Sequence, residues 1–195
     1  MNFLAHFHLA WPDEKVVAGA LEGDYYKGAL HSQPPLAIGI ALHRSIDSYT
    51  DSHQLVAQLR EKFPQHLRRY AGILIDLAFD HYLSIHWARF SSQPLTAFTH
   101  QTLCMLQSQQ HALGEPAQRM LARMVEHDIL NLYQHWETVP SAALNIGKRF
   151  KRGNPFCDLE PALTPLRDDI EKTFLEFYPS LEQHSANRLA ELSKK

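Results

Sequence analysis

Carboxylate and imidazole side chains recur one helical turn apart in the N-terminal half of this 195-residue chain, which contains 13 histidines. His43, Asp47 and Asp51 stand at i, i+4 and i+8, so a helix there would carry an imidazole and two carboxylates along one face. Asp76 and Asp80 repeat the four-residue step. Mixed His and Asp ligands suit Mn²⁺, Mg²⁺, Fe²⁺ or Zn²⁺, so the spacing indicates a divalent metal site without choosing the metal.

Asp76 lies in the most apolar stretch of the chain, between Ile73 and Phe79. An unpaired carboxylate is costly to bury, so we expect Asp76 to meet a cation. That cation is either an arginine, such as Arg44 or Arg69, or a divalent ion shared with other carboxylates and imidazoles. The residues alone leave both alternatives open.

Other known arrangements of catalytic or metal-binding residues are missing from the sequence. There is no His-Glu-x-x-His pair, EF-hand loop, Gly-x-Ser-x-Gly elbow, Gly-x-Gly-x-x-Gly loop or P-loop. If the protein is an enzyme, we therefore expect its nucleophile to be metal-activated water. The histidines without ligand spacing are expected to be surface or structural residues: His31, His66, His100, His111, His127, His135 and His184.

The composition limits the classes of partner. There are 19 Lys and Arg against 21 Asp and Glu, for a formal charge of −2, so a nucleic-acid partner is not indicated. No signal peptide or membrane-length apolar run is visible, which favours a cytoplasmic protein without a membrane partner. Cys104 and Cys157 are not part of a CxxC motif, and we expect both to be small core residues.

Apolar residues recur every three or four positions, which predicts that helices position these side chains. We expect residues 1–195 to form a single all-α domain, a bundle of several helices. The helices are expected as follows: from Pro12-Asp13-Glu14 toward Asp24, from Pro34-Pro35 through Asp51, from Leu55 to Phe63, from Gln65 to Phe90 as the central helix, and from Leu166 to Tyr178 before a polar tail.

A basic cluster runs through Lys148, Arg149, Lys151 and Arg152, with Phe150 inside it. A solvated helix face is one explanation for such a run. The other is a docking surface for a phosphate-bearing or acidic partner.

Four motifs resemble, in order, the acyl carrier protein phosphodiesterase family. They are Met1–Ala10 (MNFLAHFHLA), Gly23–Gly28 (GDYYKG), His43–Asp51 (HRSIDSYTD) and Asp76–His81 (DLAFDH). Phe174–Pro179 (FLEFYP) also resembles the family, so the similarity spans nearly the whole chain.

This resemblance implies a helical fold related to the HD phosphohydrolases, with a rearranged set of ligands. It also implies a reaction, because members of the family hydrolyse the phosphodiester that joins 4′-phosphopantetheine to a serine of holo-acyl carrier protein. Mn²⁺ is the metal that the resemblance favours. Acyl carrier proteins are small and acidic, which would give the basic cluster a partner.

The resemblance, taken with the chemistry above, implies roles for individual residues. We expect metal ligands at His6, Asp24, His43 and Asp76, and catalytic groups at Asp47, Asp80, His81 and Lys27. Asp47 or His81 would donate a proton or orient a ligand, and Lys27 would steady the phosphate. Two other functions stay open: an HD-like phosphohydrolase acting on nucleotides or another small phosphodiester, and a non-catalytic helical module that binds metal or an acidic partner.

Overall fold

The protein is described by a computed structural model that covers residues 1–29 and 36–194. Within those ranges it consists of α-helices and short 3₁₀ turns without a β-strand, which confirms the predicted all-α class. The helices are α1 (Phe3–Ala10), α2 (Glu14–Glu22), α3 (Ala37–Ser52), α4 (Gln54–Lys62), α5 (Ala71–Ile85), α6 (Leu95–Ser108), α7 (Glu115–His127), α8 (Ile129–Leu132), α9 (Thr138–Gly147), α10 (Glu160–Leu163) and α11 (Arg167–Leu192).

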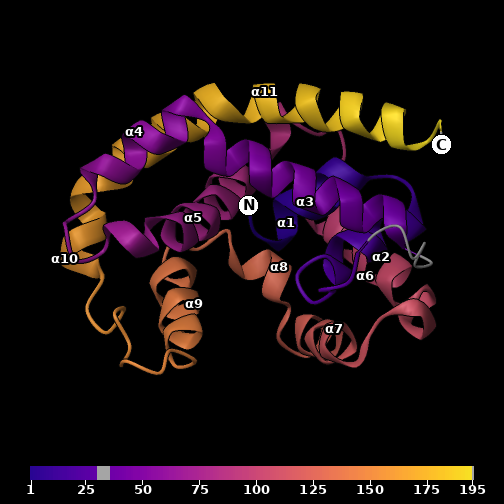
Figure 1. Ribbon diagram of the computed structural model, residues 1–195, viewed down its shortest axis with the longest axis horizontal. Helices are drawn as coiled ribbons and strands as arrows, with labels where there is room; N and C mark the ends of the chain where they lie inside the picture. Colours follow the sequence, from indigo (N-terminus) through magenta and orange to yellow (C-terminus); the bar gives the residue numbers. More distant parts are fainter. Residues whose placement is uncertain (30–35, 195) are drawn as a thin grey trace.

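The longest helix, α11, forms one edge of the molecule and lies along α3 (Figure 1). On its other side α3 packs against α2, and α1 packs against both α2 and α5. Helices α7 and α9 project from the opposite edge of the molecule, with the short α8 between them (Figure 1). The acidic and histidine-bearing helices are therefore neighbours at the centre of the molecule.

Helix α1 is buried on nearly every side: Leu4, Ala5 and Phe7 have no exposed surface. Such a helix carries no polar face, so hydrophobic periodicity does not reveal it, and the sequence analysis did not predict it. Its neighbour α5 is equally enclosed, with Leu74, Ile75 and a long run of later residues in the core. These two helices form the apolar base on which the polar residues sit.

Several predicted boundaries agree with the structure. Asp13 caps α2 by accepting the backbone N–H of Lys15 at 2.8 Å and that of Val16 at 3.1 Å, as the Pro-Asp-Glu start indicated. Helix α4 matches the segment predicted from Leu55 to Phe63. The predicted start of the next helix at Pro34-Pro35, like His31, lies outside the described residues.

The central helix predicted from Gln65 to Phe90 was too long. Arg68–Tyr70 and Trp87–Arg89 are separate 3₁₀ turns, and only α5 between them is α-helical. At the C-terminal break, His86 leaves the α-helical region, and the indole N–H of Trp87 donates to the carbonyl of Gln93. The second turn still buries Trp87, so periodicity alone did not locate the C-terminal break. The first turn buries no side chain.

The last helix was predicted to stop at Tyr178, but α11 continues through Pro179 to Leu192. A proline inside a helix removes one backbone hydrogen bond and costs roughly 3 kcal/mol. Here the residues on both sides of it are held in place, since Tyr178 and Leu181 are fully buried. Tertiary packing therefore outweighs the local penalty.

The two cysteines were also wrongly predicted, because Cys104 and Cys157 are both exposed rather than in the core. No helix among the described residues has the combination of length and apolar character that crossing a membrane requires.

Helices α2 and α3 touch backbone to backbone at Gly19 and Gly39. A Cβ added at Gly19 would lie 2.7 Å from the Cα of Gly39 and 2.5 Å from the carbonyl oxygen of Leu36. Both distances are below any normal contact, and both involve backbone atoms that cannot rotate away. This contact sets the distance between the helix that leads into Asp24 and the helix that carries His43.

We predict that Gly19→Ala destabilises the protein by about 1–3 kcal/mol, although alanine favours helix by roughly 1 kcal/mol, because the helices must separate. Gly72→Ala on α5 is the matched control, since its new Cβ would meet only the end of the Arg60 side chain, at 3.2 Å. Urea unfolding measures both variants. Equal stability of the two would contradict the proposed close contact.

Candidate metal centre

One carboxylate joins two histidines from different helices. Oδ1 of Asp47 lies 3.1 Å from Nε2 of His6, and Oδ2 lies 3.1 Å from Nε2 of His43. The three residues present ligand atoms that all lie within 4.8 Å of one another. Both histidines are buried, whereas the Asp47 side chain is 41 % exposed, so the cluster is open to solvent on one side.

The orientation of the His43 ring is set by a hydrogen bond of its other ring nitrogen, Nδ1. Its Nδ1–H donates to the carbonyl of Ala20 at 2.8 Å, which directs Nε2 toward the cluster. A backbone carbonyl in this position is the usual way that a protein fixes a metal-binding imidazole. Gly23 leaves room for the ring, since a Cβ there would lie 2.4 Å from Cγ of His43.

His6 is stacked on His43, with ring centroids 3.9 Å apart and planes 11° from parallel. Burial and the charge of His43 lower the pKa of His6 to about 3, so His6 is neutral near pH 7. Its Nδ1 is buried and has no hydrogen-bond partner among the described residues. A neutral imidazole is the form that ligates metals.

Two further carboxylates lie beside the cluster. Oδ1 of Asp24, in the loop after α2, is 3.7 Å from Nε2 of His43, and burial raises the pKa of Asp24. Burial also acts to raise the pKa of Asp47, but the hydrogen bonds of His43 and His6 outweigh it and hold that pKa far below its ordinary value. Asp47 is therefore ionised at any working pH, and Asp24 is the more readily protonated of the two.

Asp76 does meet a cation, as expected, but that cation is the α-ammonium of Met1 at 2.9 Å. The same ammonium lies 3.4 Å from Oδ1 of Asp47. Burial lowers its pKa, but the charges of Asp76 and Asp47 outweigh this effect and raise the pKa to about 10. Arg44 and Arg69 make other contacts, with the carbonyls of the Asp24 loop and with Tyr70 respectively.

Asp80 is fully buried and holds the start of α1. Its carboxylate accepts the backbone N–H of Leu4 at 2.7 Å and that of Ala5 at 3.2 Å. These are donors that the first turn of a helix leaves without intrahelical partners. Burial raises the pKa of Asp80 to about 7, against the lowering effect of the two N–H groups. Asp80 thus fixes the helix from which His6 projects.

His43 and Asp47 of the cluster line a surface cleft of about 430 Å³ that also contains Asp24, Lys27 and Arg44. The guanidinium of Arg44 donates to the carbonyls of Tyr26 at 2.9 Å and Gly28 at 3.0 Å. Arg44 therefore holds the loop that bears Asp24 and Lys27 against α3. The ammonium of Lys27 lies 3.3 Å from the carbonyl of Asp24, at the edge of the cleft.

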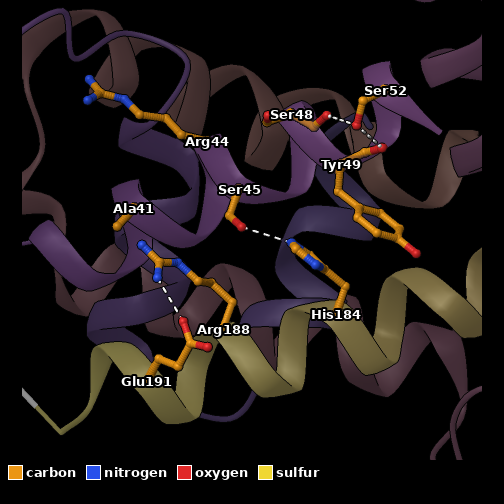
Figure 2. Close-up of a pocket in the computed structure, with 9 residues that line it drawn as sticks. All are labelled: Ala41, Arg44, Ser45, Ser48, Tyr49, Ser52, His184, Arg188 and Glu191. Atoms are coloured by element: carbon orange, nitrogen blue, oxygen red, sulfur yellow. Dashed lines mark hydrogen bonds and ion pairs between the residues drawn. The ribbon is translucent and has the colours of Figure 1, made fainter.

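The opposite face of α3 forms a second pocket of about 590 Å³ against α11. Figure 2 shows Ser45 directed at His184 of α11, at 2.9 Å, while Arg44 points away from Arg188. The His184 ring also stacks on Tyr49, with centroids 4.2 Å apart. These contacts fix the rotation of α3 about its axis, and so direct His43 and Asp47 toward the cleft.

Other predicted site residues lie elsewhere. Nδ1–H of His81 donates to the carbonyl of Tyr133 at 2.8 Å, and its ring packs edge-on against Trp136. Asp51, the third residue of the predicted acidic face, pairs with Arg60 instead of joining the cluster. The basic run Lys148, Arg149, Lys151 and Arg152 is exposed and follows α9.

Sequence reasoning missed three contributors to the site: the α-ammonium of Met1, Gly23 and Arg44 as the anchor of a loop. Gly23 and Arg44 do stand inside the quoted motifs, so their positions were a usable signal. The ammonium gave no signal, because spacing along the chain does not show where a chain end folds.

The donor set fits a divalent cation. Without a metal, Nε2 of His43 donates to Asp47 and also faces Asp24; when that proton leaves, three acceptors converge and need a positive charge between them. Two imidazoles and carboxylates suit Mn²⁺, Fe²⁺ and Zn²⁺ well, and the set selects no single metal.

Comparison with known proteins gives one consistent result. A sequence model of a family described as acyl carrier protein phosphodiesterase matches residues 1–181. Among curated proteins, acyl carrier protein phosphodiesterases from Escherichia coli and Salmonella agona are 31 % and 30 % identical to this chain, each over 96 % of it and 99 % of the relative. The enzyme of that name from Photorhabdus laumondii is 29 % identical over 96 % of both chains. No solved structure matches.

We predict that Asp47→Asn weakens Mn²⁺ binding at least about tenfold, because it removes the charge that both histidines share. Asp51→Asn is the control, one helical turn further along α3 on an exposed side chain that pairs with Arg60. Titration calorimetry with Mn²⁺ measures the affinity, and thermal unfolding with and without Mn²⁺ gives an independent readout. Undiminished Mn²⁺ binding by Asp47→Asn would exclude this carboxylate as a ligand.

Proposed function

Because the chain belongs to the acyl carrier protein phosphodiesterase family, we propose that it hydrolyses the phosphodiester linking 4′-phosphopantetheine to a serine of holo-acyl carrier protein. Water adds to phosphorus, the bond from phosphorus to the serine oxygen breaks, and the products are apo-acyl carrier protein and 4′-phosphopantetheine. The observation that carries the proposal is the His6–Asp47–His43 cluster, two members of which, His43 and Asp47, line an open cleft. We propose that residues 1–195 act as one domain, in the cytoplasm.

The proposed metal ligands are Nε2 of His6, Nε2 of His43 and the carboxylate of Asp47, with Asp24 adjoining them. A divalent cation, with Mn²⁺ the favoured one, supplies charge neutralisation of the phosphate and a lower pKa for water when it is bound. We therefore propose Asp47 as a metal ligand, whereas the sequence led us to expect a proton donor or a residue that orients a ligand.

Asp24 is the better proton donor to the departing serine oxygen. Its pKa is raised by burial, so its carboxyl group holds a proton more readily than the strongly ionised Asp47. His81 makes its contacts with Tyr133 and Trp136 instead. The catalytic group we propose is therefore Asp24, with the ammonium of Lys27 at the cleft edge to bind a phosphate oxygen.

Asp76 and Asp80 take positioning roles in this proposal. Asp76 holds the α-ammonium of Met1 beside Asp47, and Asp80 holds the first turn of α1. Both interactions fix the part of the chain that delivers His6. Neither carboxylate needs to touch the substrate for its loss to reduce activity.

The direct test is release of 4′-phosphopantetheine from holo-acyl carrier protein in the presence of Mn²⁺. We predict turnover by the wild type and a loss of at least about a hundredfold in His43→Gln, equivalent to about 2.7 kcal/mol of transition-state stabilisation. His100→Gln, at an exposed position of α6 away from the cleft, is the control and should keep most of the activity.

Two outcomes would replace the proposal. Cleavage of nucleotides or other small phosphodiesters without attack on holo-acyl carrier protein would favour a general phosphohydrolase. Bound metal without hydrolysis of either class would favour a binding module.

The exposed basic run is proposed to attract the acidic carrier protein. We predict that reversing Lys148, Arg149, Lys151 and Arg152 to Glu raises KM for the holo-protein and flattens its dependence on salt. Reversal of Lys151 and Arg152 alone should give part of the effect, whereas Arg119→Glu with Lys172→Glu, equal in charge and located on α7 and α11, should not. Equal kinetics for the two double variants would remove the run from the docking surface.

A further inference from the structure

A mainly apolar groove of about 430 Å³ lies between α7 and α9, with α8 and the start of α1 at its base. Figure 1 shows α7 and α9 projecting on either side of α8, with the N-terminus above α8 in the view, between α5 and α1. The apolar part of its lining comes from Phe3, Leu77, Met120, Ile129, Leu132 and Ile146. Leu132 is 43 % exposed, so the groove presents apolar surface that a ligand would cover.

The inner end of the groove is next to the metal centre. Asn2 lines the groove and follows Met1, whose α-ammonium lies 3.4 Å from Asp47. Leu77 lines the groove and follows Asp76, the second partner of that ammonium. Neighbouring residues of the chain thus contribute to both places, which puts the inner end of the groove close to the metal centre.

Charged residues at the outer edge of the groove also connect the groove with the metal cleft. Arg123 and Arg149 line the groove, and both interact electrostatically with Tyr25, which also interacts with the neighbouring Asp24 of the metal cleft. Arg149 belongs to the basic run proposed to meet the carrier protein. The groove and the proposed docking surface therefore share Arg149.

The polar lining has the character of a site for amides. Asn2 and Asn145 contribute side-chain amides, and Tyr133, Thr138 and Ser141 contribute hydroxyls. The amide of Asn2 donates to the Tyr133 hydroxyl at 2.6 Å, which fixes both groups at the inner end. Thr138 donates to the carbonyl of Leu132 and Asn145 accepts from Lys148, and these groups keep further donors and acceptors. Amides and hydroxyls between apolar walls suit a narrow chain in which amide groups alternate with hydrocarbon.

We propose that this groove binds the pantetheine arm of the holo-carrier protein, the two-amide chain that extends from the phosphate away from the serine. This inference rests on the proposed function, since it assigns the other half of the same substrate. The phosphate occupies the metal cleft, and the arm passes Asn2 and Phe3 into the groove, where its methyl and methylene groups meet Leu77 and Leu132.

The test fills the groove without touching the metal ligands. Ser141→Trp adds a large side chain from an exposed position on α9, and Leu132→Glu places a charge on the apolar wall. Leu144→Trp is the matched control, since it introduces the same side chain on α9 at an exposed position outside the groove. Thermal unfolding and Mn²⁺ titration verify that all three variants keep the fold and the metal site.

We expect Ser141→Trp and Leu132→Glu each to raise KM for holo-acyl carrier protein about tenfold or more, and Leu144→Trp to stay within about twofold of the wild type. Free pantetheine, which lacks the phosphate, should bind the wild type in a calorimetric titration and should not bind Ser141→Trp. Wild-type KM values in both groove variants would overturn the assignment of the groove while leaving the proposed function intact.

If the wild type releases no 4′-phosphopantetheine, the proposed function fails. The pantetheine titration still decides the groove in that case, since it requires no turnover. Binding that Ser141→Trp abolishes and Leu144→Trp preserves would support a pantetheine site, and absence of binding to the wild type would overturn it.

Discussion

The carboxylate of Asp47 has one oxygen on His6 of α1 and the other on His43 of α3. This bridge is possible only if the two helices keep a fixed distance and rotation, and the surrounding structure supplies both. Gly19 and Gly39 let α2 approach α3 backbone to backbone, and Gly23 leaves space for the His43 ring. On the far side, His184 of α11 binds Ser45 and stacks on Tyr49.

Four carboxylates gather around this bridge, and each has a positive or donating partner. Asp76 has the α-ammonium of Met1, Asp80 has two backbone N–H groups of α1, and Asp24 and Asp47 face the imidazole of His43. Asp80 is the fully buried one, and its burial would be costly without the two N–H groups; the other three side chains stay partly exposed. The arrangement keeps the open side of the cluster negative, which favours the entry of a divalent cation.

Sequence reasoning reached the all-α class and the ligand-bearing face of α3 because both depend on local spacing. It placed Asp47 beside His43, which the i, i+4 relation requires, but it extended the face to Asp51, which turns instead to Arg60. The partner of Asp76 and the role of Asp80 depend on where the first residues of the chain pack. Periodicity does not reveal that packing, because α1 is apolar on nearly every side and carries no amphipathic stripe.

The helix ends show the same division between local and tertiary causes. Asp13 caps α2 through contacts within three residues, and its position was predicted. Pro179 was expected to end the last helix, yet α11 continues because Tyr178 and Leu181 are buried on either side of it. The groove between α7 and α9 is likewise tertiary, since its walls come from segments far apart in the sequence.

The central claim is that His6, His43 and Asp47 form one metal centre. The measurement that tests it most directly is anomalous X-ray diffraction from crystals of the protein grown with Mn²⁺. The account predicts an anomalous peak within coordination distance of Nε2 of His6, Nε2 of His43 and the carboxylate of Asp47. Full-occupancy Mn²⁺ at another set of side chains, with the His6–Asp47–His43 hydrogen bonds unchanged, would contradict it.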